Sequence, residues 1–374
     1  MRKLLIFTIT VAMLFHSLAS FCYAQTEIAI SAESAVLIDA DSGEVLWKKS
    51  AYKKMGMAST TKVMTALTVL RISSPDETVT VSKEAVGTEG SSVYLCEGEK
   101  MTVEDMLCCL LLASANDAAV ALAIHCSGSV ENFCEEMNGY AEELGLENTH
   151  FTNPHGLYNE EHYTTAYELA VICREAMKNQ LLSRIFATYK TTVPFCGEAD
   201  KRLVVNHNKL IRSYDGAVGI KTGFTKKTGR CLTSAATRDG LTLICVTLNA
   251  PDDWRDHTAL LDYGYENYYR YTFAKSGKFT YDMPVVGGES SSVTLTNLSE
   301  LSMTLPRSHG EPEVTVISNY RFIYAPATQG AVYATVTLSC NGQTVSSPLA
   351  ADVSVSYKHK KGIAQKIADL FEKD

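Results

Sequence analysis

The periodicity of hydrophobic and polar positions changes along the chain and divides it into segments. Between Ser31 and Trp47, two short apolar runs flank Asp41-Ser42-Gly43, a pattern that predicts two strands joined by a turn. A polar stretch then gives way at Ser59 to an apolar run, 63–70, which predicts a helix that is buried on every side. Because such a helix belongs in the middle of a domain, we expect Ser59 to lie deep.

Helical spacing continues through the next hundred residues and then gives way to strands. Thr102 opens a pattern typical of a capping box, which marks the start of a helix. The predicted helices are 106–113, 117–125, 130–144 and 166–178, and the predicted strands are 217–222, 231–236 and 241–249, with a turn at 238–240 between the last two strands.

The composition changes again after about Tyr271, where Ser, Thr, Val, Gly and Pro become dominant. The strands predicted there are 292–296, 313–317 and 333–339, and Asn341-Gly342 is a strong turn signal. Residues 272–357 are therefore predicted to form a separate, small β-sandwich-like domain that offers no cluster of catalytic residue types.

The two ends of the chain carry patterns of their own. A basic start, an apolar block from Leu4 to Phe15 and small residues before a cleavage point after Ala24 predict a signal peptide, 1–24, and hence export to the outer face of the membrane or the cell wall. Acylation at Cys22 is the less favoured alternative. The tail, 358–374, has Lys residues followed by apolar residues at helical spacing, which suits either an anionic membrane surface or a short helix docked on its own domain.

Composition limits the partners and cofactors of the mature chain. About 350 residues would remain after cleavage, enough for roughly two domains, the first being 25–271. A net charge of −8 without a large basic cluster argues against nucleic acid. Most cysteines stand in apolar contexts, which favours buried thiols. Neither the cysteines nor the histidines show zinc-binding spacing, so we expect no metal and no cofactor.

Ser59 and Lys62 are the first candidates for catalysis. At positions i and i+3 they would share one helix face, so the amine could take the proton of the hydroxyl. The alternative is that Ser59 is only an N-cap. A capping box, however, favours Glu or Gln three residues later, whereas a charged Lys near the helix start costs about 0.3–1 kcal/mol. The short motif leaves both interpretations open.

Lys62 can act as a base only when it is neutral. Burial lowers the pKa of a lysine, and a nearby cation lowers it further. Lys221-Thr222-Gly223 could supply that cation from a strand, with Gly leaving room for backbone to approach a ligand. The same tripeptide recurs at 227–229 in a polar turn, where an ordinary structural role explains it.

Ser114 and Asn116 lie two residues apart between two predicted helices. Both side chains could point into one cleft, where Ser114 could relay a proton and Asn116 could bind a substrate amide. The alternative is an N-cap for the helix at Asp117.

S-x-x-K, S-x-N and K-T-G occur here in the order that is the signature of penicillin-binding proteins and serine β-lactamases, with Ala115 where the middle motif often has Asp. The surrounding segments 114–119, 152–157 and 219–225 indicate one group of proteins within this set. From about Ile28 to Tyr265 the chain resembles the low-molecular-mass D-alanyl-D-alanine carboxypeptidases, and it does so more faintly beyond.

The resemblance implies an α+β fold of the β-lactamase/transpeptidase type: an antiparallel sheet flanked by helices, then a β domain and an amphipathic tail. It implies a penicillin-inhibited serine hydrolase that removes the terminal D-alanine of peptidoglycan stem pentapeptides through an acyl-enzyme. In the implied mechanism Ser59 is the nucleophile, Lys62 is the base, and Ser114 and Asn116 complete the hydrogen-bond network. Lys221 and Thr222 bind the carboxylate of the substrate. The backbone N–H groups of Ser59 and Phe224, beside Gly223, form the oxyanion hole.

Two rival functions remain open from the sequence. A β-lactamase needs a deacylating Glu, and the segment 143–148 comes close to that pattern, with Glu147 inserted before Asn148. A catalytically inactive wall-binding or scaffold protein could keep the same fold. His155 and His257 are interpreted as structural residues, His155 because its Asn-Pro-His-Gly context is typical of a turn.

Overall fold

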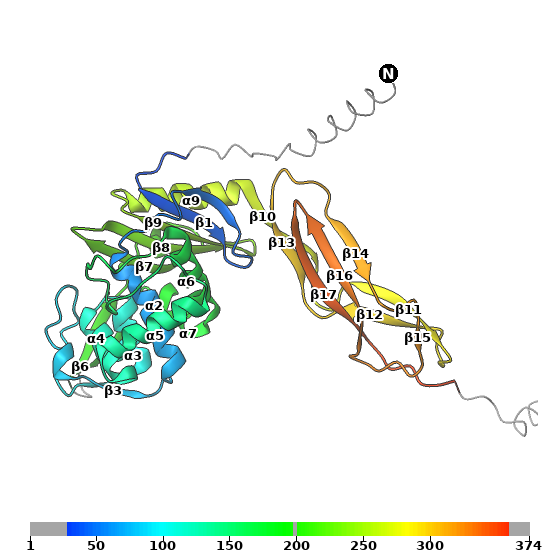
Figure 1. Ribbon diagram of the computed structural model, residues 1–374, viewed down its shortest axis with the longest axis horizontal. Helices are drawn as coiled ribbons and strands as arrows, with labels where there is room; N and C mark the ends of the chain where they lie inside the picture. Colours follow the sequence, from blue (N-terminus) through cyan, green and yellow to red (C-terminus); the bar gives the residue numbers. More distant parts are fainter. Residues whose placement is uncertain (1–27, 197–199, 359–374) are drawn as a thin grey trace, which may run out of the picture.

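The computed structural model describes residues 28–196 and 200–358. The predicted signal peptide and, apart from Lys358, the predicted tail lie outside these ranges. Within them, none of the helices combines the length and the apolar character that crossing a bilayer requires. Figure 1 shows two bodies, an N-terminal domain of helices and sheet and a C-terminal domain made only of strands.

A five-stranded antiparallel sheet forms the centre of the N-terminal domain. The predicted strands are confirmed, although most extend a few residues further than expected. In sheet order they are β2 (Val45–Lys49), β1 (Ser34–Asp39), β9 (Leu241–Leu248), β8 (Gly229–Arg238) and β7 (Ala217–Thr225).

The sheet separates two hydrophobic cores. Alternation along β1 sends Val36 and Ile38 into the larger core, which the helices fill, and Leu37 into the smaller one beneath α9 (Asp253–Asn267). The helices of the larger core are α2 (Lys62–Ile72), α3 (Val103–Leu111), α4 (Asn116–Ser127), α5 (Val130–Glu143), α6 (Ala166–Lys178) and α7 (Gln180–Ala187). The short α8 (Leu210–Ser213) lies beside β7 and contributes Leu210 to the smaller core.

Helix α2 occupies the middle of the larger core, as the sequence predicts, and its residues 62–69 are all buried. The predicted start at Ser59 needs correction, because a 3-10 turn, η1 (Ala58–Thr61), precedes the α-helix. The hydroxyls of Thr60 and Thr61 donate to the carbonyls of Met57 and Ala58, at 2.6 and 2.8 Å, and these bonds favour the tighter turn.

Smaller elements pack against α3 and α4. The capping box is confirmed, since the Thr102 hydroxyl accepts from the Asp105 N–H at the start of α3. A long loop, 86–99, precedes that helix. The flanking elements are β3 (Thr78–Thr80) with β4 (Lys100–Thr102), η2 (Lys83–Ala85), and the hairpin of β5 (Lys190–Phe195) and β6 (Asp200–Val205).

Two packed sheets make up the C-terminal domain. One pairs β10 (Tyr268–Ala274) with β13 (Leu301–Pro306), so the expected boundary after Tyr271 falls inside β10. The other contains, in order, β14 (Glu313–Ile317), β16 (Val332–Cys340), β17 (Gln343–Ala351), β12 (Ser292–Asn297), β11 (Thr280–Val286) and β15 (Ile323–Tyr324). Asn341 and Gly342 both have positive φ, 48° and 82°, which confirms the predicted hairpin turn.

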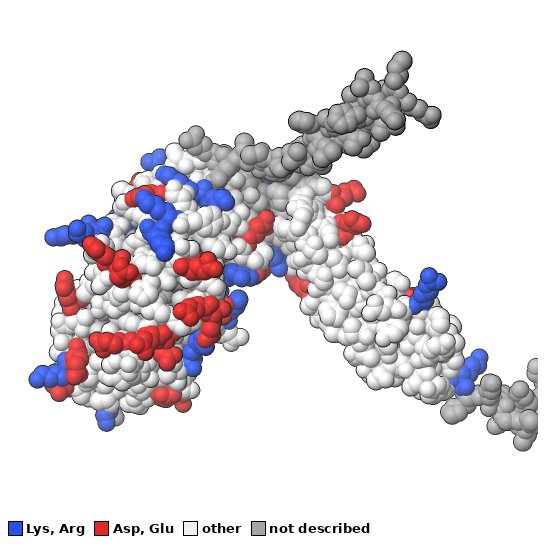
Figure 2. Space-filling model, in the orientation of Figure 1, with Lys and Arg blue, Asp and Glu red and all other residues white. Residues whose placement is uncertain are grey.

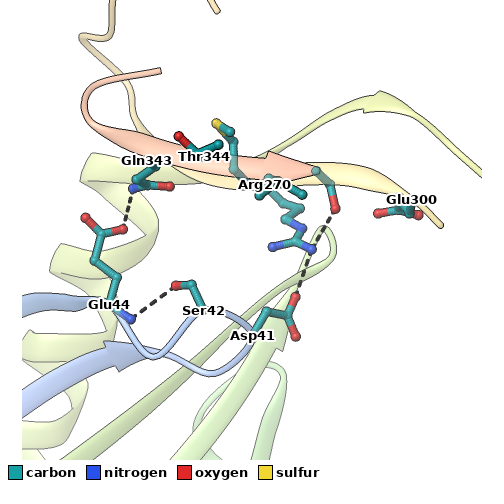
Figure 3. A pocket seen from close by; sticks show the side chains of 10 residues that line it. Asp41, Ser42, Glu44, Arg270, Glu300, Gln343 and Thr344 are labelled. Carbon is teal, nitrogen blue, oxygen red and sulfur yellow. Dashed lines mark hydrogen bonds and ion pairs between the residues drawn. The ribbon is translucent and has the colours of Figure 1, made fainter. Parts of the chain in front are cut away.

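Polar contacts join the two domains near the β1–β2 turn. Arg270 pairs with Asp41 at 3.1 Å and donates to the Ser302 hydroxyl at 2.7 Å, while Gln343 donates to Glu44 (Figure 3). These residues line a pocket between the domains, and Ser59 is not one of its lining residues. In Figure 2 the charged side chains gather on the N-terminal domain, whereas the visible face of the C-terminal domain carries few.

Candidate active site

Ser59 and Lys62 meet as the sequence predicts. The side-chain nitrogen of Lys62 lies 2.8 Å from the Ser59 hydroxyl and donates to the side-chain oxygen of Asn116 and to the backbone carbonyl of His155, both at 2.7 Å. Ser59 makes no side-chain capping bond, because the 3-10 turn begins after Met57 and the cap of α2 is Thr61. The capping interpretation of Ser59 is therefore wrong.

The electrostatic environment favours a neutral Lys62. Complete burial lowers its pKa well below the ordinary 10.5, the positive charge of Lys221 lowers it further, and the Asp117 carboxylate opposes these effects. Lys221 thus lies where its charge influences Lys62, as the sequence-based hypothesis requires. Lys221 is itself only 1% exposed, and burial lowers its pKa to about 7. Its amine donates to the Thr222 carbonyl at 2.8 Å.

Gly223 brings strand β7 against the turn that carries the serine. A Cβ added at Gly223 would lie 3.0 Å from the backbone nitrogen of Ser59 and 3.1 Å from the carbonyl oxygen of Met57. Because both neighbours are backbone atoms, a side chain there would push the strand away from Ser59. Phe224 follows and is 64% exposed to solvent.

Asn116 and Ser114 flank the start of α4. The Asn116 side chain bridges Lys62 and the carbonyl of Glu89 in loop 86–99. Ser114 is 5% exposed and has a positive φ of 61°. The N-cap position of α4 belongs to Ala115, so neither residue takes the capping role. Among the described residues, the Ser114 hydroxyl has no hydrogen bond to Ser59 or Lys62.

Asp117 is a residue whose importance the sequence did not reveal. Its buried carboxylate accepts hydrogen bonds from the Ser92 hydroxyl at 2.6 Å and from the backbone N–H groups of Val93 and Leu95 at 3.2 and 3.1 Å. It therefore anchors loop 86–99, whose Glu89 carbonyl positions Asn116. A buried Asp inside an alanine-rich helix is the signal that could have identified it.

His155 contributes through its backbone rather than through its ring. Its carbonyl oxygen accepts a hydrogen bond from the Lys62 side-chain nitrogen. Its Nδ1 accepts a hydrogen bond from the Leu157 N–H at 3.2 Å, which stabilises the turn. Burial and the neighbouring charge of Lys62 lower the pKa of the ring to about 4. His257 lies buried against the Thr247 hydroxyl, 3.0 Å away, in the core beneath α9.

The second K-T-G copy occupies the β7–β8 turn, as expected. Lys227 is exposed, and Thr228 bonds Thr225 within the hairpin, at 2.9 Å between the hydroxyls. The deacylating carboxylate of a β-lactamase is also not in place. Glu143 pairs with Arg71 at the end of α2 opposite to Ser59, and the Asn148 backbone N–H donates to Glu168. Among the described residues, no carboxylate forms a hydrogen bond or ion pair with the Ser59 or Lys62 side chain.

The arrangement suits nucleophilic catalysis. A hydroxyl beside a neutral amine can lose its proton as it attacks a carbonyl carbon, and the backbone N–H groups near Gly223 and Ser59 can stabilise the negative oxygen that results. A buried ammonium at Lys221 can attract an anionic substrate group. One group of potential metal ligands occurs among the described residues, Cys96, Glu99 and Cys196, at a separate place in the domain.

Comparisons with known proteins agree with this site. A family model described as D-alanyl-D-alanine carboxypeptidase matches residues 22–252. The D-alanyl-D-alanine carboxypeptidase DacF of Bacillus subtilis is 34% identical over 341 residues, which cover 87% of this chain and 86% of that protein.

Solved structures show the same architecture. Penicillin binding protein 5 from Haemophilus influenzae has a TM-score of 0.70 at 28% identity, covering 88% of this chain and 99% of its own. PBP3 from Streptococcus pneumoniae, described as a peptidoglycan synthesis regulatory factor, has a TM-score of 0.75 at 23% identity, covering 88% and 100%, and supports the fold alone. The predicted fold class is confirmed.

Proposed function

The chain belongs to the D-alanyl-D-alanine carboxypeptidase family, peptidase family S11, and from this premise we propose how its residues carry out the reaction. It is a serine-type carboxypeptidase that removes the terminal D-alanine from peptidoglycan stem pentapeptides through an acyl-enzyme that penicillin traps. The observation that carries the assignment of residues is the contact between the Ser59 hydroxyl and the buried Lys62 amine.

In the acylation step, Lys62 takes the proton of Ser59 while the Ser59 oxygen attacks the carbonyl carbon of the penultimate D-alanine. The backbone N–H groups of Ser59 and Phe224 bind the oxyanion. As the C–N bond breaks, the proton on Lys62 passes through the Ser114 hydroxyl to the nitrogen of the leaving D-alanine. In deacylation, water attacks the ester carbonyl and gives a proton to Lys62. As the ester C–O bond breaks, Lys62 passes that proton to the Ser59 oxygen, and the shortened peptide leaves as a carboxylic acid.

The remaining residues of the site bind the substrate. Lys221 and Thr222 bind the terminal carboxylate, an interaction that the buried ammonium favours once the partner charge arrives. Asn116 binds a backbone amide of the stem peptide, and Gly223 lets the substrate lie along β7. A β-lactam presents a carboxylate and a strained amide in the same relative positions, so the same groups bind it.

The proposed location is outside the cytoplasmic membrane. Residues 1–24 direct export, 25–271 form the catalytic unit and 272–357 form the β domain. The tail, 358–374, makes peripheral contact with the membrane or cell wall. Exposed aromatic side chains of the C-terminal domain support such a contact, and they are Tyr281, Tyr320, Phe322, Tyr324 and Tyr357. The net charge of −8 supports the absence of a nucleic-acid partner.

Mass spectrometry of a muropeptide pentapeptide incubated with the purified mature protein tests the reaction. We expect the loss of one alanine, and its absence with Ser59→Ala. The two K-T-G copies offer a matched pair: Lys221→Ala should raise KM and lower kcat/KM at least about 100-fold, and Lys227→Ala should leave both unchanged. An unchanged pentapeptide would contradict the activity, and equal effects of the two lysine variants would contradict the site.

A fluorescent penicillin separates this function from the rivals. Labelling of the wild type but not of Ser59→Ala excludes an inactive scaffold. Rapid turnover of a chromogenic cephalosporin would instead indicate a β-lactamase.

A further inference from the structure

Two cysteines that are 100 residues apart in the sequence meet at the surface of the N-terminal domain. Cys96 lies in loop 86–99, and Cys196 lies at the tip of the β5–β6 hairpin. Their sulfur atoms and a carboxylate oxygen of Glu99 all lie within 4.8 Å of one another. Both cysteines are exposed, whereas the other cysteines of the described ranges are buried or half-buried.

Noncovalent contacts already hold the two segments together at this place. The Glu99 carboxylate accepts from the Cys96 backbone N–H at 3.0 Å and from the Cys196 backbone N–H at 3.3 Å. Arg202, on the other strand of the hairpin, pairs with Glu99 at 3.1 Å and donates to the Tyr94 carbonyl. Because Glu99 and Arg202 are both nearly buried, this clamp fixes the backbones on which the two thiols stand.

We propose that Cys96 and Cys196 form a disulfide bond in the exported protein, which staples loop 86–99 to the β5–β6 hairpin. Two thiols and one small-molecule disulfide give the protein disulfide and two small-molecule thiols, so the small disulfide is reduced as the two cysteines are oxidised. The proposal relies on the proposed export only for oxidising surroundings. It does not depend on the catalytic roles.

A metal ion fits the cluster less well than a disulfide does. The Glu99 oxygens are already engaged by two backbone N–H groups and by the Arg202 guanidinium, whose positive charge also repels a cation.

The bond would stabilise the loop that supports the active site. It closes a segment that contains Asp117 and Asn116, and loop 86–99 gives these residues their partners Ser92 and Glu89. A crosslink across about 100 residues removes much conformational entropy from the unfolded chain. We expect the oxidised protein to melt about 5–15 °C above the reduced one.

Treatment of the purified mature protein with oxidised glutathione tests the proposal. Non-reducing digestion and mass spectrometry should find a peptide pair joined through Cys96 and Cys196 that separates on reduction. The rise in Tm should disappear in Cys96→Ser and in Cys196→Ser. The matched control is Cys126→Ser, at a half-buried cysteine whose neighbour is the Ser73 hydroxyl, and it should keep the rise.

Two results would overturn the proposal. One is separate glutathione adducts on Cys96 and Cys196 without a crosslink. The other is zinc retained by the reduced wild type and lost in Cys96→Ser, with no crosslink on oxidation. Either result leaves pentapeptide hydrolysis as a separate measurement, so the failure of the disulfide and the failure of the enzymatic function are distinguishable.

Discussion

Replacement of Lys221 by methionine should make the protein more stable while it abolishes function. Lys221 is a fully buried amine whose pKa is about 7 instead of 10.5. That difference corresponds to about 5 kcal/mol, at 1.36 kcal/mol per pKa unit, by which burial disfavours the charged form. Methionine keeps a similar length and volume but has no charge to desolvate.

The sign of the effect follows from proton linkage. The folded state binds the Lys221 proton more weakly than the unfolded state does, so the destabilisation is fully present below pH 7 and disappears as the pH rises from about 7 to 10.5. At pH 7 it is about 4 kcal/mol. The variant also loses the hydrogen bond to the Thr222 carbonyl, which reduces the gain in stability by about 1 kcal/mol. We expect Lys221→Met to gain about 3 kcal/mol at pH 7 and about 1 kcal/mol at pH 9.

Urea unfolding followed by tryptophan fluorescence measures this difference in the right domain. The two tryptophans of the chain, Trp47 and Trp254, lie in β2 and α9, so the signal reports the N-terminal domain. Lys227→Met, at the exposed lysine of the second K-T-G copy, is the matched control and should change stability by less than about 0.5 kcal/mol.

The pH dependence decides whether the reasoning is correct. Groups that Lys221 does not influence act equally in the wild type and in Lys221→Met, so they cancel in the difference. The pKa of Lys62 rises when the Lys221 charge is removed, and this change adds to the gain in stability in the same direction. A variant that is less stable than the wild type at pH 7 would refute the argument. So would a difference that stays constant between pH 7 and 9, because a buried charge would then not be its cause.

Two further variants test the backbone features of the site. Gly223→Ala should slow acylation by penicillin by at least about 100-fold, because the added Cβ would press on the Ser59 backbone. The control is Gly139→Ala, at a helix position with open space, which should add about 0.5–1 kcal/mol of stability without slowing acylation. Equal acylation rates for the two variants would contradict the close approach of Gly223 to Ser59. His155→Gln should keep kcat/KM within about tenfold of the wild type and leave the pH profile of kcat/KM between pH 5.5 and 8 unchanged, because the ring, with a pKa of about 4, is neutral throughout this range. A loss of about 1000-fold in kcat/KM, together with the loss of an inflection in that pH profile, would instead show that the ring carries a proton in the reaction.

The sequence was sufficient to predict contacts that depend on local spacing. Ser59 and Lys62 meet because positions i and i+3 adjoin in any helical turn, and the 3-10 turn at Ser59 preserves that relation. A neutral Lys62 implied a second cation from a distant part of the chain. Lys221 is that residue, because it is close enough for its positive charge to lower the pKa of Lys62. The Asn341-Gly342 hairpin followed from the φ values that its turn demands.

Contacts that depend on how distant loops pack could not be predicted. The carbonyl of His155 reaches Lys62 from 93 residues away, and a backbone atom leaves no residue-type signal in the sequence. Cys96 and Cys196 carry no zinc-like spacing, so their proximity emerges only from the docking of the hairpin on loop 86–99. The strand β10 began before the composition changed, because its first residues still pack against the N-terminal domain.

Positive φ angles of non-glycine residues occur at all three sequence motifs of the site, and two of these motifs also carry a buried lysine. Ala58 and Ile220 have positive φ, 48° and 129°, and each directly precedes a catalytic candidate, Ser59 or Lys221. Ser114 itself has a φ of 61°. Such conformations cost about 1–3 kcal/mol each, and the two buried lysines add a further cost, which the larger core must offset. Selection for stability alone would remove every one of these features. Their occurrence at three separated motifs is therefore best explained by one requirement, to hold an uncharged Lys62 against Ser59 beside a cationic Lys221.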